Sequence, residues 1–401
     1  MLDQQPRAAA DASDANEPEA DRANQRRPRK ILHVVPAMNR GGIETSLMHI
    51  LRHVDRVHYR MDFLTLQAMA GAYDDEIRAL GSRVLACPAS PWPWQFARRF
   101  ARILREFGPY DIVHSHVHYF GGFALMLAAR QGVPGRIAHS RYDNRVVEMK
   151  RWWPRRLYVR SMKHLIRRYS TFRVAISRTA ADDLFDSTWS DDPWFRMIFS
   201  GRDFSTYMEQ HDRTGVRRAL GLPDDALVVG HAGRFYPVKN HDFVVDVAAE
   251  VMKRAPQARL LLVGDGPDQS RIEARVRALK IADRVVFTGA HTDVAKLMAA
   301  AMDVFVFPSH HEGLGLVLVE AQAAGLPCVL SDALPEEVDV VPALMHRLSP
   351  AAPAEAWADR LLAVAAGPRP TADSALAAVT ESDFAIDRSL ERLLQVYDTV
   401  A

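Results

Sequence analysis

Two series of short apolar runs, each alternating with helical stretches, constrain the fold of this chain more than any other feature. Runs rich in Val, Ile, Leu and Phe that are separated by helical segments are typical of parallel strands covered by helices on both faces. The first series is predicted at 31–35, 61–66, 83–86, 111–114, 136–138 and 172–176. The second is predicted at 227–230, 258–263, 284–287, 304–307 and 327–330. The sequence therefore predicts an α/β protein with two parallel sheets.

The break between the two series divides the chain. A length of 401 residues supports two domains, each with its own core. The polar first 28 residues have no apolar periodicity, so we expect residues 1–28 to form a disordered tail. The other boundaries fall between the two series and before an amphipathic helix predicted at about 384–400, which gives the segments 29–204, 205–382 and 383–401.

Composition excludes several classes of protein. Charged residues make up 25% and hydrophobic residues 48% of the chain, as in ordinary globular proteins. Cys87 and Cys328 lie far apart within apolar runs, which indicates buried thiols rather than a disulfide framework or a metal cluster. No apolar run is long enough to span a bilayer, and the N-terminus has no secretory apolar segment. We therefore expect a cytoplasmic protein, or one on the cytoplasmic face of a membrane.

One segment is strongly basic. Residues 150–178 include many Lys and Arg and no Asp or Glu, interleaved with Trp152, Trp153, Tyr158 and Tyr169. Such a segment suits an anionic membrane surface, with the aromatic rings at the level of the headgroups, or it is a solvated helix face. We expect no nucleic-acid partner, because no nucleic-acid motif accompanies the segment and the net charge of the chain is only +2.

The fourth run of the second series leads into a predicted anion site. A glycine-bearing turn follows it, and then a helix that begins near Leu316, whose N-terminus offers free amides and a partial positive charge to a phosphate. Gly313 and Gly315 permit a ligand to approach the backbone closely. Glu312 lies in the turn and Glu320 about two helical turns further on, so the two carboxylates suit a sugar and a ribose. An isolated turn of this kind is also compatible with a purely structural role.

The spacing Glu-x7-Glu, followed by Ala-Gln-Ala-Ala-Gly-Leu-Pro at 321–327, resembles the donor-binding signature of retaining glycosyltransferases with the GT-B fold, family GT4. The resemblance extends over nearly the whole chain from Lys30 onward. It implies two Rossmann-like domains that face each other across an interdomain cleft. It also implies that the acceptor binds the first domain, that the nucleotide-sugar donor binds mainly the second, and that the segment 383–401 returns to the first.

Two cations follow the first run of the second series. Arg234 and Lys239 lie on the loop His231–Asn240, and the family has an Arg and a Lys at the matching places. A guanidinium fork and an ammonium suit a diphosphate, whose negative charge grows as it leaves the sugar. Either cation alone is also compatible with an ordinary surface loop.

Two glycine turns follow other runs and resemble turns of the family. Gly41 and Gly42 lie after the first run, before a helix predicted to open at Thr45. Gly264 and Gly266 lie after the second run of the second series. Each turn on its own is weak evidence for a ligand site. Its position beyond the carboxyl end of a parallel strand is the feature that favours ligand binding.

Several histidines lie at and just beyond the end of the fourth run of the first series. His114 and His116 point to one face of a strand, but no carboxylate or cysteine stands beside them, so we set a metal site aside. The family instead places a histidine at the position of His116, near the donor sugar. His139 and Arg141, at the end of the next run, are weaker candidates on the acceptor side. Each is also compatible with a structural role.

The resemblance thus implies three groups of site residues. The catalytic group is His116, Arg234, Lys239 and Glu312. The acceptor group is Glu44, His139 and Arg141. The donor group is Gly41, Gly42, Gly233, Gly264, Gly266, Gly313, Leu314, Gly315, Leu316, Val317 and Glu320.

No Asp-x-Asp motif occurs in the chain. Transferases that hold the diphosphate through Mg²⁺ usually need such carboxylates. We therefore expect metal-independent catalysis without a cofactor. The chain departs from the common family pattern at two places: Ser-Gly-Arg-Asp stands at 200–203 in place of Asn-Gly-Val/Ile-Asp, and 331–337 lack a Gly-Gly turn.

The predicted function is retaining transfer of a sugar from a nucleotide-sugar donor to a glycan or lipid-linked acceptor. The motifs Gly-Gly-Ile-Glu-Thr, His-Ser-His and Leu-Pro-Cys-Val-Leu-Ser-Asp look most like those of exopolysaccharide and capsule transferases. Two alternatives remain: a sugar-nucleotide epimerase, which shares the fold and needs no acceptor, and a non-catalytic nucleotide-sugar-binding protein.

Overall fold

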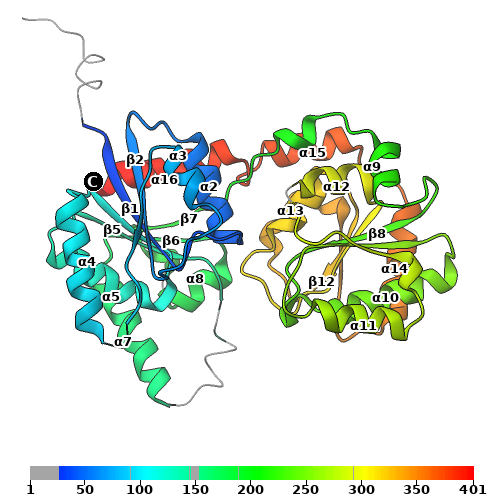
Figure 1. Cartoon of the computed structure of the whole chain (residues 1–401), viewed down its shortest axis with the longest axis horizontal. Helices are drawn as coiled ribbons and strands as arrows, with labels where there is room; N and C mark the ends of the chain where they lie inside the picture. The colour runs from blue at the N-terminus through cyan, green and yellow to red at the C-terminus, as the bar shows by residue number, and fades with distance from the viewer. Residues whose placement is uncertain (1–26, 91, 144, 146–152, 188, 292) are drawn as a thin grey trace, which may run out of the picture.

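The computed structural model describes residues 27–90, 92–143, 145, 153–187, 189–291 and 293–401 and forms two lobes, each built on one parallel sheet (Figure 1). The predicted tail 1–28 lies outside these residues except for Arg27 and Pro28, and so do residues 150–152 of the basic segment. Within the described residues, no helix combines the length and the apolar character that a bilayer crossing requires.

The first lobe contains a seven-stranded sheet in the order β3-β2-β1-β4-β5-β6-β7, with every pair parallel. Its strands are β1 (Arg29–Val35), β2 (Tyr59–Thr65), β3 (Val84–Ala86), β4 (Ile112–Ser115), β5 (Gly135–Ser140), β6 (Phe172–Ala175) and β7 (Phe195–Met197).

The second lobe contains a six-stranded parallel sheet in the order β10-β9-β8-β11-β12-β13. Its strands are β8 (Val228–Ala232), β9 (Arg259–Val263), β10 (Val285–Phe287), β11 (Val304–Phe307), β12 (Cys328–Ser331) and β13 (Met345–Leu348).

Helices cover both faces of each sheet, as the nearly continuous apolar runs predict. In the first lobe, one core cluster joins the sheet to α2 (Gly42–His53), α3 (Asp74–Ala79) and α16 (Ile386–Val400). The opposite face packs on α4 (Pro93–Phe107), α5 (Gly121–Arg130), α7 (Trp153–Tyr169) and α8 (Arg178–Phe185). In the second lobe, α10 (His241–Arg254), α11 (Gln269–Ala278) and α14 (Ala354–Ala366) cover one face. The other face packs on α9 (Arg213–Ala219), α12 (Val294–Ala301), α13 (Leu316–Ala323) and α15 (Ala372–Thr380).

The strand order reverses beside the first strand of each sheet. β1 lies between β2 and β4, and β8 lies between β9 and β11, so the loops that leave β1 and β4, or β8 and β11, diverge to opposite faces. Ligands of open parallel sheets bind beyond the carboxyl ends of the strands at such a switch point. The predicted motifs after β1, β4, β8 and β11 therefore lie where the topology leaves room for a ligand.

The chain crosses between the lobes twice, and the two crossings run side by side. Ile198 belongs to the core of the first lobe and Phe204 to that of the second. The chain returns between Phe384, in the second core, and Ile386, in the first. α16 then runs back along the first lobe (Figure 1), where it contacts α2. The crossings pair as a parallel bridge between Arg202 and Ala385.

The predicted α/β fold is confirmed, and each of the eleven predicted strands overlaps an observed one. Two strands were missed, β7 and β13. Both are edge strands; β7 has three residues and β13 reads Met-His-Arg-Leu, so neither gives an apolar run. One helix start was wrong: α2 begins at Gly42 rather than Thr45, because the Thr45 amide already donates to the Gly41 carbonyl at 2.9 Å. The division of the chain at residues 204 and 382 stays a proposal.

Candidate active site

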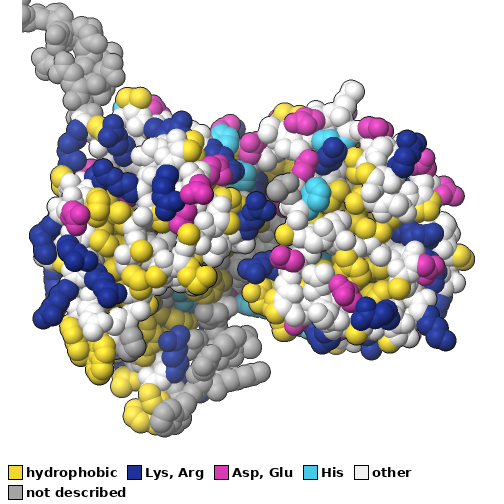
Figure 2. Space-filling view, viewed as in Figure 1, with side chains coloured by type: hydrophobic (Ala, Val, Ile, Leu, Met, Phe, Trp, Pro, Cys, Tyr) yellow, Lys and Arg dark blue, Asp and Glu magenta, His cyan; other side chains and the backbone are white. Residues whose placement is uncertain are grey.

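A cleft of about 880 Å³ lies between the two lobes, and Figure 2 shows the hollow between them. The first lobe contributes Gly42, Glu44 and Arg141 of the predicted residues. The second contributes most of the predicted set: Gly233, Arg234, Lys239, Gly264, Glu312, Gly313, Leu314, Gly315, Leu316, Val317 and Glu320.

The turn after β11 brings the helix N-terminus to the cleft. Gly315 has the left-handed backbone (φ 82°) that favours glycine, and α13 begins at the next residue, Leu316. No described side chain caps this end of α13, and Leu316 and Val317 both line the cleft. The first-turn amides are therefore placed to meet an anion.

The same turn touches the opposite lobe. A side chain at Gly313 would place its Cβ 2.7 Å from the carbonyl oxygen of Arg141, so only glycine fits there without a shift. The Ser177 hydroxyl donates to the Gly313 carbonyl at 2.7 Å, and His311 Nε2 lies 2.6 Å from the carbonyl oxygen of Asp143. The glycine turn of the second lobe thus packs directly on loops of the first.

Lys239 and Glu312 form an ion pair in the cleft. Their Nζ and Oε1 atoms lie 2.6 Å apart, and the side chains are 19% and 14% exposed. The Lys239 ammonium also lies 4.9 Å from the centre of the Phe307 ring. The sequence assigned one residue to the diphosphate and the other to the sugar, but it gave no sign that the two hold each other.

Arg234, by contrast, forms no ion pair with any carboxylate of the described residues. Its side chain is exposed and lies over the Tyr236 ring at 5.0 Å. An exposed guanidinium over an aromatic ring retains its charge and its donors for a ligand. Of the two predicted cations, Arg234 is therefore the one whose charge is uncompensated.

Glu320 is paired with Arg202, a residue that the sequence alone did not place in the site. Arg202 Nε donates to Glu320 Oε1 at 2.8 Å, and both side chains line the cleft. Arg202 lies in the Ser-Gly-Arg-Asp segment, which stands out in the sequence only as a departure from the family pattern. That departure was the one signal in the sequence that pointed to it.

Arg141 is a buried cation at the floor of the cleft. The residue is 5% exposed, its Nε donates to His116 Nδ1 at 3.3 Å, and one terminal nitrogen donates to the Ser200 hydroxyl at 2.8 Å. The other terminal nitrogen has no partner among the described residues. Burial lowers the pKa of Arg141 to about 9, and burial raises the pKa of the nearby Glu44 carboxyl. One nitrogen of this buried guanidinium therefore still lacks an acceptor among the described residues.

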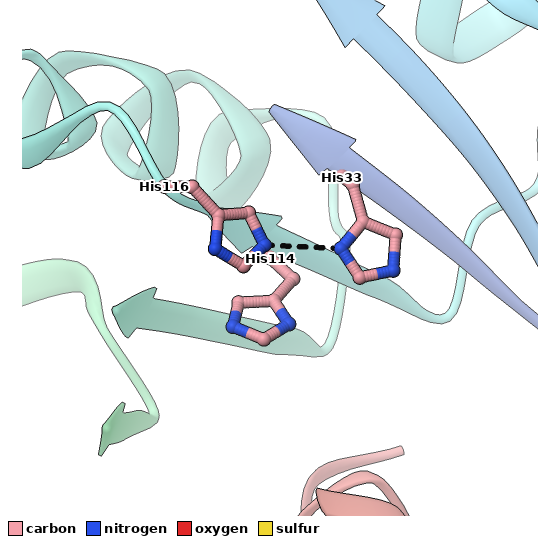
Figure 3. A group of neighbouring side chains, drawn as sticks. All are labelled: His33, His114 and His116. Atoms are coloured by element: carbon pink, nitrogen blue, oxygen red, sulfur yellow. Dashed lines mark hydrogen bonds between the residues drawn. The ribbon is translucent and has the colours of Figure 1, made fainter. Parts of the chain in front are cut away.

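Four buried histidines lie beneath Arg141, and Figure 3 shows three of them. Side chains alternate between the faces of a strand, so His33, His114 and His139 share the face of the sheet that α16 covers. His116 follows β4. His33 Nδ1 lies 3.0 Å from His116 Nε2, and His114 Nε2 lies 3.0 Å from His139 Nδ1. We call these four residues the histidine cluster.

The contacts of the cluster define the proton positions of one pair. Arg141 donates to His116 Nδ1, so neutral His116 carries its proton on Nε2 and donates to His33 Nδ1. On the other side, His114 Nδ1 lies 2.8 Å from the Tyr397 hydroxyl of α16. The cluster thus connects the cleft floor to the C-terminal helix through hydrogen bonds.

The contacts of the cluster do not favour a metal ion. One nitrogen from each of His33, His114 and His116 falls within 4.8 Å of the others. However, His33 Nδ1 and His116 Nε2 already face each other at 3.0 Å, and His116 Nδ1 accepts from Arg141. The Arg141 charge would also repel a cation. The absence of a metal stays a prediction.

Four predicted site residues do not line the cleft. His116 and His139 are buried in the cluster at 1% and 3% exposure, and His116 reaches the cleft only through Arg141. Gly41 is the N-cap residue of α2 and does not line the cleft. Gly266 serves backbone packing, because a Cβ there would lie 2.6 Å from the main chain of Phe235. Their roles in binding stay predictions.

The histidine cluster predicts that the protein loses stability in mild acid. Burial lowers the pKa of His33 to about 3 and the pKa values of His114, His116 and His139 well below the usual value. Below pH about 6.5 the unfolded chain binds protons that the folded chain does not. Stability is therefore full above that pH and falls as the pH drops from about 6.5 toward 3, by about 1.4 kcal/mol per pH unit for each such histidine.

Urea denaturation between pH 7.5 and 5 measures this slope. Replacing His33 with Asn should make it shallower, whereas replacing the exposed His164 with Gln should leave it unchanged. A free energy of unfolding that stays constant over this range would show that the cluster is not held neutral by burial.

Two family models match the chain. The model for glycosyl transferases group 1 covers residues 212–373, and that for the glycosyl transferase 4-like domain covers 41–193. "Putative glycosyltransferase EpsF" of Bacillus subtilis is 34% identical over 92% of this chain and 96% of its own length. The D-inositol 3-phosphate glycosyltransferase of Mycobacterium bovis is 28% identical over 89% of this chain and 78% of its own length.

Solved structures show the same fold. Anabaena HepE in complex with UDP-glucose has a TM-score of 0.76 and 19% identity, over 92% of this chain and 99% of its own. Sucrose-phosphate synthase from Thermosynechococcus elongatus has a TM-score of 0.74 and 20% identity, over 92% and 98%. Both matches extend over the two lobes. The family models and the 34% identity to EpsF show that the chain belongs to the GT4-type glycosyltransferases, and the solved structures show that its fold is GT-B.

Proposed function

We propose that the enzyme transfers a sugar from a nucleoside-diphosphate sugar to an acceptor hydroxyl, with retention of the anomeric configuration and without a metal ion. The observation that carries the proposal is the convergence of Arg234, Lys239 and the uncapped N-terminus of α13 on one cleft wall. A guanidinium, an ammonium and main-chain amides are donors that suit a diphosphate. The donor would therefore bind mainly to the second lobe.

The same groups would stabilise the leaving group. As the bond between the sugar and the diphosphate breaks, negative charge develops on the phosphate oxygens. Fixed positive groups aimed at that charge lower the barrier without rearranging, and a single such donor is often worth a factor of about 10² or more in rate. Arg234 supplies uncompensated charge, and the amides of Leu316 and Val317 supply the helix dipole.

The donor would also rearrange the Lys239–Glu312 pair. Both residues line the cleft, and their contact leaves the pair nearly neutral in the unliganded protein. When a diphosphate approaches Lys239, its oxygens can share the ammonium with Glu312. Glu312 is then placed to accept hydrogen bonds from hydroxyls of the donor sugar, as the resemblance to the family implies.

In the retaining route, the acceptor hydroxyl attacks the anomeric carbon from the face that the diphosphate leaves. The new bond forms between the acceptor oxygen and the anomeric carbon, the bond to the phosphate oxygen breaks, and the departing diphosphate takes the hydroxyl proton. No side chain acts as a nucleophile. Arg141 and Glu44 line the first-lobe wall and are our candidates for contacts to the acceptor. His116 is buried behind Arg141, so it would act on the donor sugar through that guanidinium.

Metal independence is supported by the state of the cleft carboxylates. Four carboxylates line the cleft. Glu312 is paired with Lys239 and Glu320 with Arg202, each within 2.8 Å of its cation. Among the described residues, Glu44 and Asp265 belong to no group of three side chains spaced to hold an ion. A Mg²⁺ site needs carboxylates that are free to ligate. Cations of the protein would neutralise the diphosphate charge, as a metal ion does in metal-dependent transferases.

For the substrate, we propose a nucleotide sugar and a cell-surface glycan or lipid-linked acceptor, as in exopolysaccharide or capsule synthesis on the cytoplasmic side. The solved HepE complexes contain UDP and UDP-glucose, which supports a nucleoside-diphosphate sugar for this chain. The relation to EpsF and the exopolysaccharide-like motifs support the pathway.

Replacing Arg234 with Ala should lower turnover at least tenfold, because the leaving group loses its uncompensated cation. Replacing Lys239 with Ala should have an effect of the same size, and it also leaves Glu312 without its partner. The measurement is nucleoside diphosphate release from whichever nucleotide sugar most raises the thermal stability of the wild type. Replacing the exposed Arg218 with Ala is the control. Near-normal rates would remove Arg234 and Lys239 from the mechanism.

We also propose that α7 contacts an anionic membrane surface. The described part of α7 contains no acidic residue and buries only Ile166. Trp153 and Leu157 are 64% and 59% exposed beside exposed arginines that include Arg160 and Arg167. Apolar and cationic side chains on one exposed helix suit a headgroup layer.

Changing Arg160 and Arg167 to Glu should reduce co-sedimentation with vesicles of phosphatidylcholine and phosphatidylglycerol at least tenfold, since each basic residue near such a surface is worth about 1 kcal/mol. Changing the exposed Arg218 and Arg277 of the second lobe to Glu gives the same net charge and should have little effect. If the wild type bound vesicles of pure phosphatidylcholine as well as those that contain phosphatidylglycerol, the proposal would be wrong.

A further inference from the structure

Arg202 occupies an unusual position, because it belongs to the crossing between the lobes and reaches the cleft. Its amide donates to the Phe384 carbonyl at 2.8 Å, and its carbonyl accepts from the Ile386 amide at 2.9 Å. Both bonds join the first crossing to the second. The Arg202 backbone is therefore fixed at the place where the two lobes are connected.

The neighbouring residues reinforce this anchor. The Gly201 amide donates to the Ser389 hydroxyl of α16 at 3.2 Å, and a Cβ on Gly201 would lie 2.8 Å from the Ser389 side chain. The Phe199 and Phe384 rings stack with centres 4.6 Å apart and planes 9° apart. Little freedom is left to the main chain from which the Arg202 side chain projects.

From this anchor, the guanidinium holds one oxygen of Glu320. Arg202 Nε lies 2.8 Å from Oε1, and the two side chains are 9% and 23% exposed. The contact engages Oε1, and Glu320 lines the cleft, so the second carboxylate oxygen is left to accept a hydrogen bond from a ligand there. A carboxylate with one oxygen fixed in this way presents the other in a defined direction.

We propose that Arg202 is a positioning residue that orients Glu320 for the hydroxyls of the donor ribose and links ribose recognition to the connection between the lobes. This inference rests on the proposed function, because it assumes that the cleft binds a nucleoside diphosphate. Arg202 itself does not touch the nucleotide. Its effect passes through the Glu320 carboxylate.

The charge of the pair supports this role. A bare carboxylate at Glu320 would repel a diphosphate bound along the same wall, whereas the paired carboxylate is close to neutral from a distance. At hydrogen-bond distance, the free oxygen still accepts from a hydroxyl group. Arg202 thus permits an acidic ribose contact beside a phosphate site.

Two other roles for Arg202 give different outcomes. If Arg202 contacted the diphosphate directly, its loss would weaken every nucleotide equally, with or without ribose hydroxyls. If it competed with the ribose for Glu320, its loss would strengthen binding of the ribonucleotide. The orienting role predicts a specific loss of the preference for ribose hydroxyls.

The experiment compares UDP, GDP and ADP with their 2′,3′-dideoxy counterparts by calorimetry. For the base that binds best, the wild type should bind the ribonucleotide about tenfold more tightly than its 2′,3′-dideoxy counterpart. A factor of this size is expected when a hydrogen bond to a charged group is lost. Replacing Arg202 with Gln should reduce this ratio to less than about threefold, mainly by weakening the ribonucleotide. Replacing Arg202 with Lys, which keeps the positive charge but not the planar guanidinium that fixes the direction of the contact, should give an intermediate ratio.

Replacing Arg347 with Gln is the matched control. Arg347 also forms an ion pair in the second lobe, 2.7 Å from Asp339 at 18% and 22% exposure, but it does not line the cleft. Its variant should keep the wild-type ratio, and thermal unfolding reports whether either variant is merely less stable. An Arg202→Gln variant that folds and keeps the wild-type ratio, loses affinity equally for both nucleotides, or binds the ribonucleotide more tightly would overturn the inference. If none of the nucleotides binds the wild type, the proposed function itself fails.

Discussion

Parallel strands that point their carboxyl ends toward a shared gap are the constraint on which the rest of this molecule depends. In each sheet the strand order reverses beside the first strand, and the loops that leave there diverge to opposite faces and make room for a ligand. The glycine turn before α13 joins the two lobes, because Gly313 packs against the main chain of Arg141 in the other lobe. Charged side chains from both lobes are thereby brought into one cleft without being close in sequence.

The cleft resolves an electrostatic conflict. Ribose and sugar hydroxyls are best recognised by carboxylates, but a diphosphate is repelled by them. In this protein the two glutamates on the donor wall each have a cation: Lys239 for Glu312 and Arg202 for Glu320. Arg234 and the α13 amides remain uncompensated and give the wall its preference for an anion. At the floor of the cleft, burial lowers the pKa of the histidines, so the histidine cluster is neutral. Arg141 is the cation that lies beside it.

Much of this could be predicted from the sequence, because the signals are local. The strand β11, the turn and the start of α13 at Leu316 follow from apolar runs and from glycines within a dozen residues. The contacts that define the electrostatics are not local. Lys239 and Glu312 are 73 residues apart, Arg202 and Glu320 are 118 apart, and His114 and Tyr397 are 283 apart. Only the folded chain shows that residues chosen for separate roles pair with each other, or that His33 completes a cluster begun by His114 and His116.

The central claim is that protein cations and main-chain amides, with no bound ion, hold the diphosphate. A crystal structure of the protein with UDP, GDP or ADP, prepared in the presence of EDTA, tests it most directly. We expect a diphosphate between Arg234, Lys239 and the amides of Leu316 and Val317, with no ion beside it. An empty cleft, or a nucleotide that appears only when Mg²⁺ is added, would contradict it.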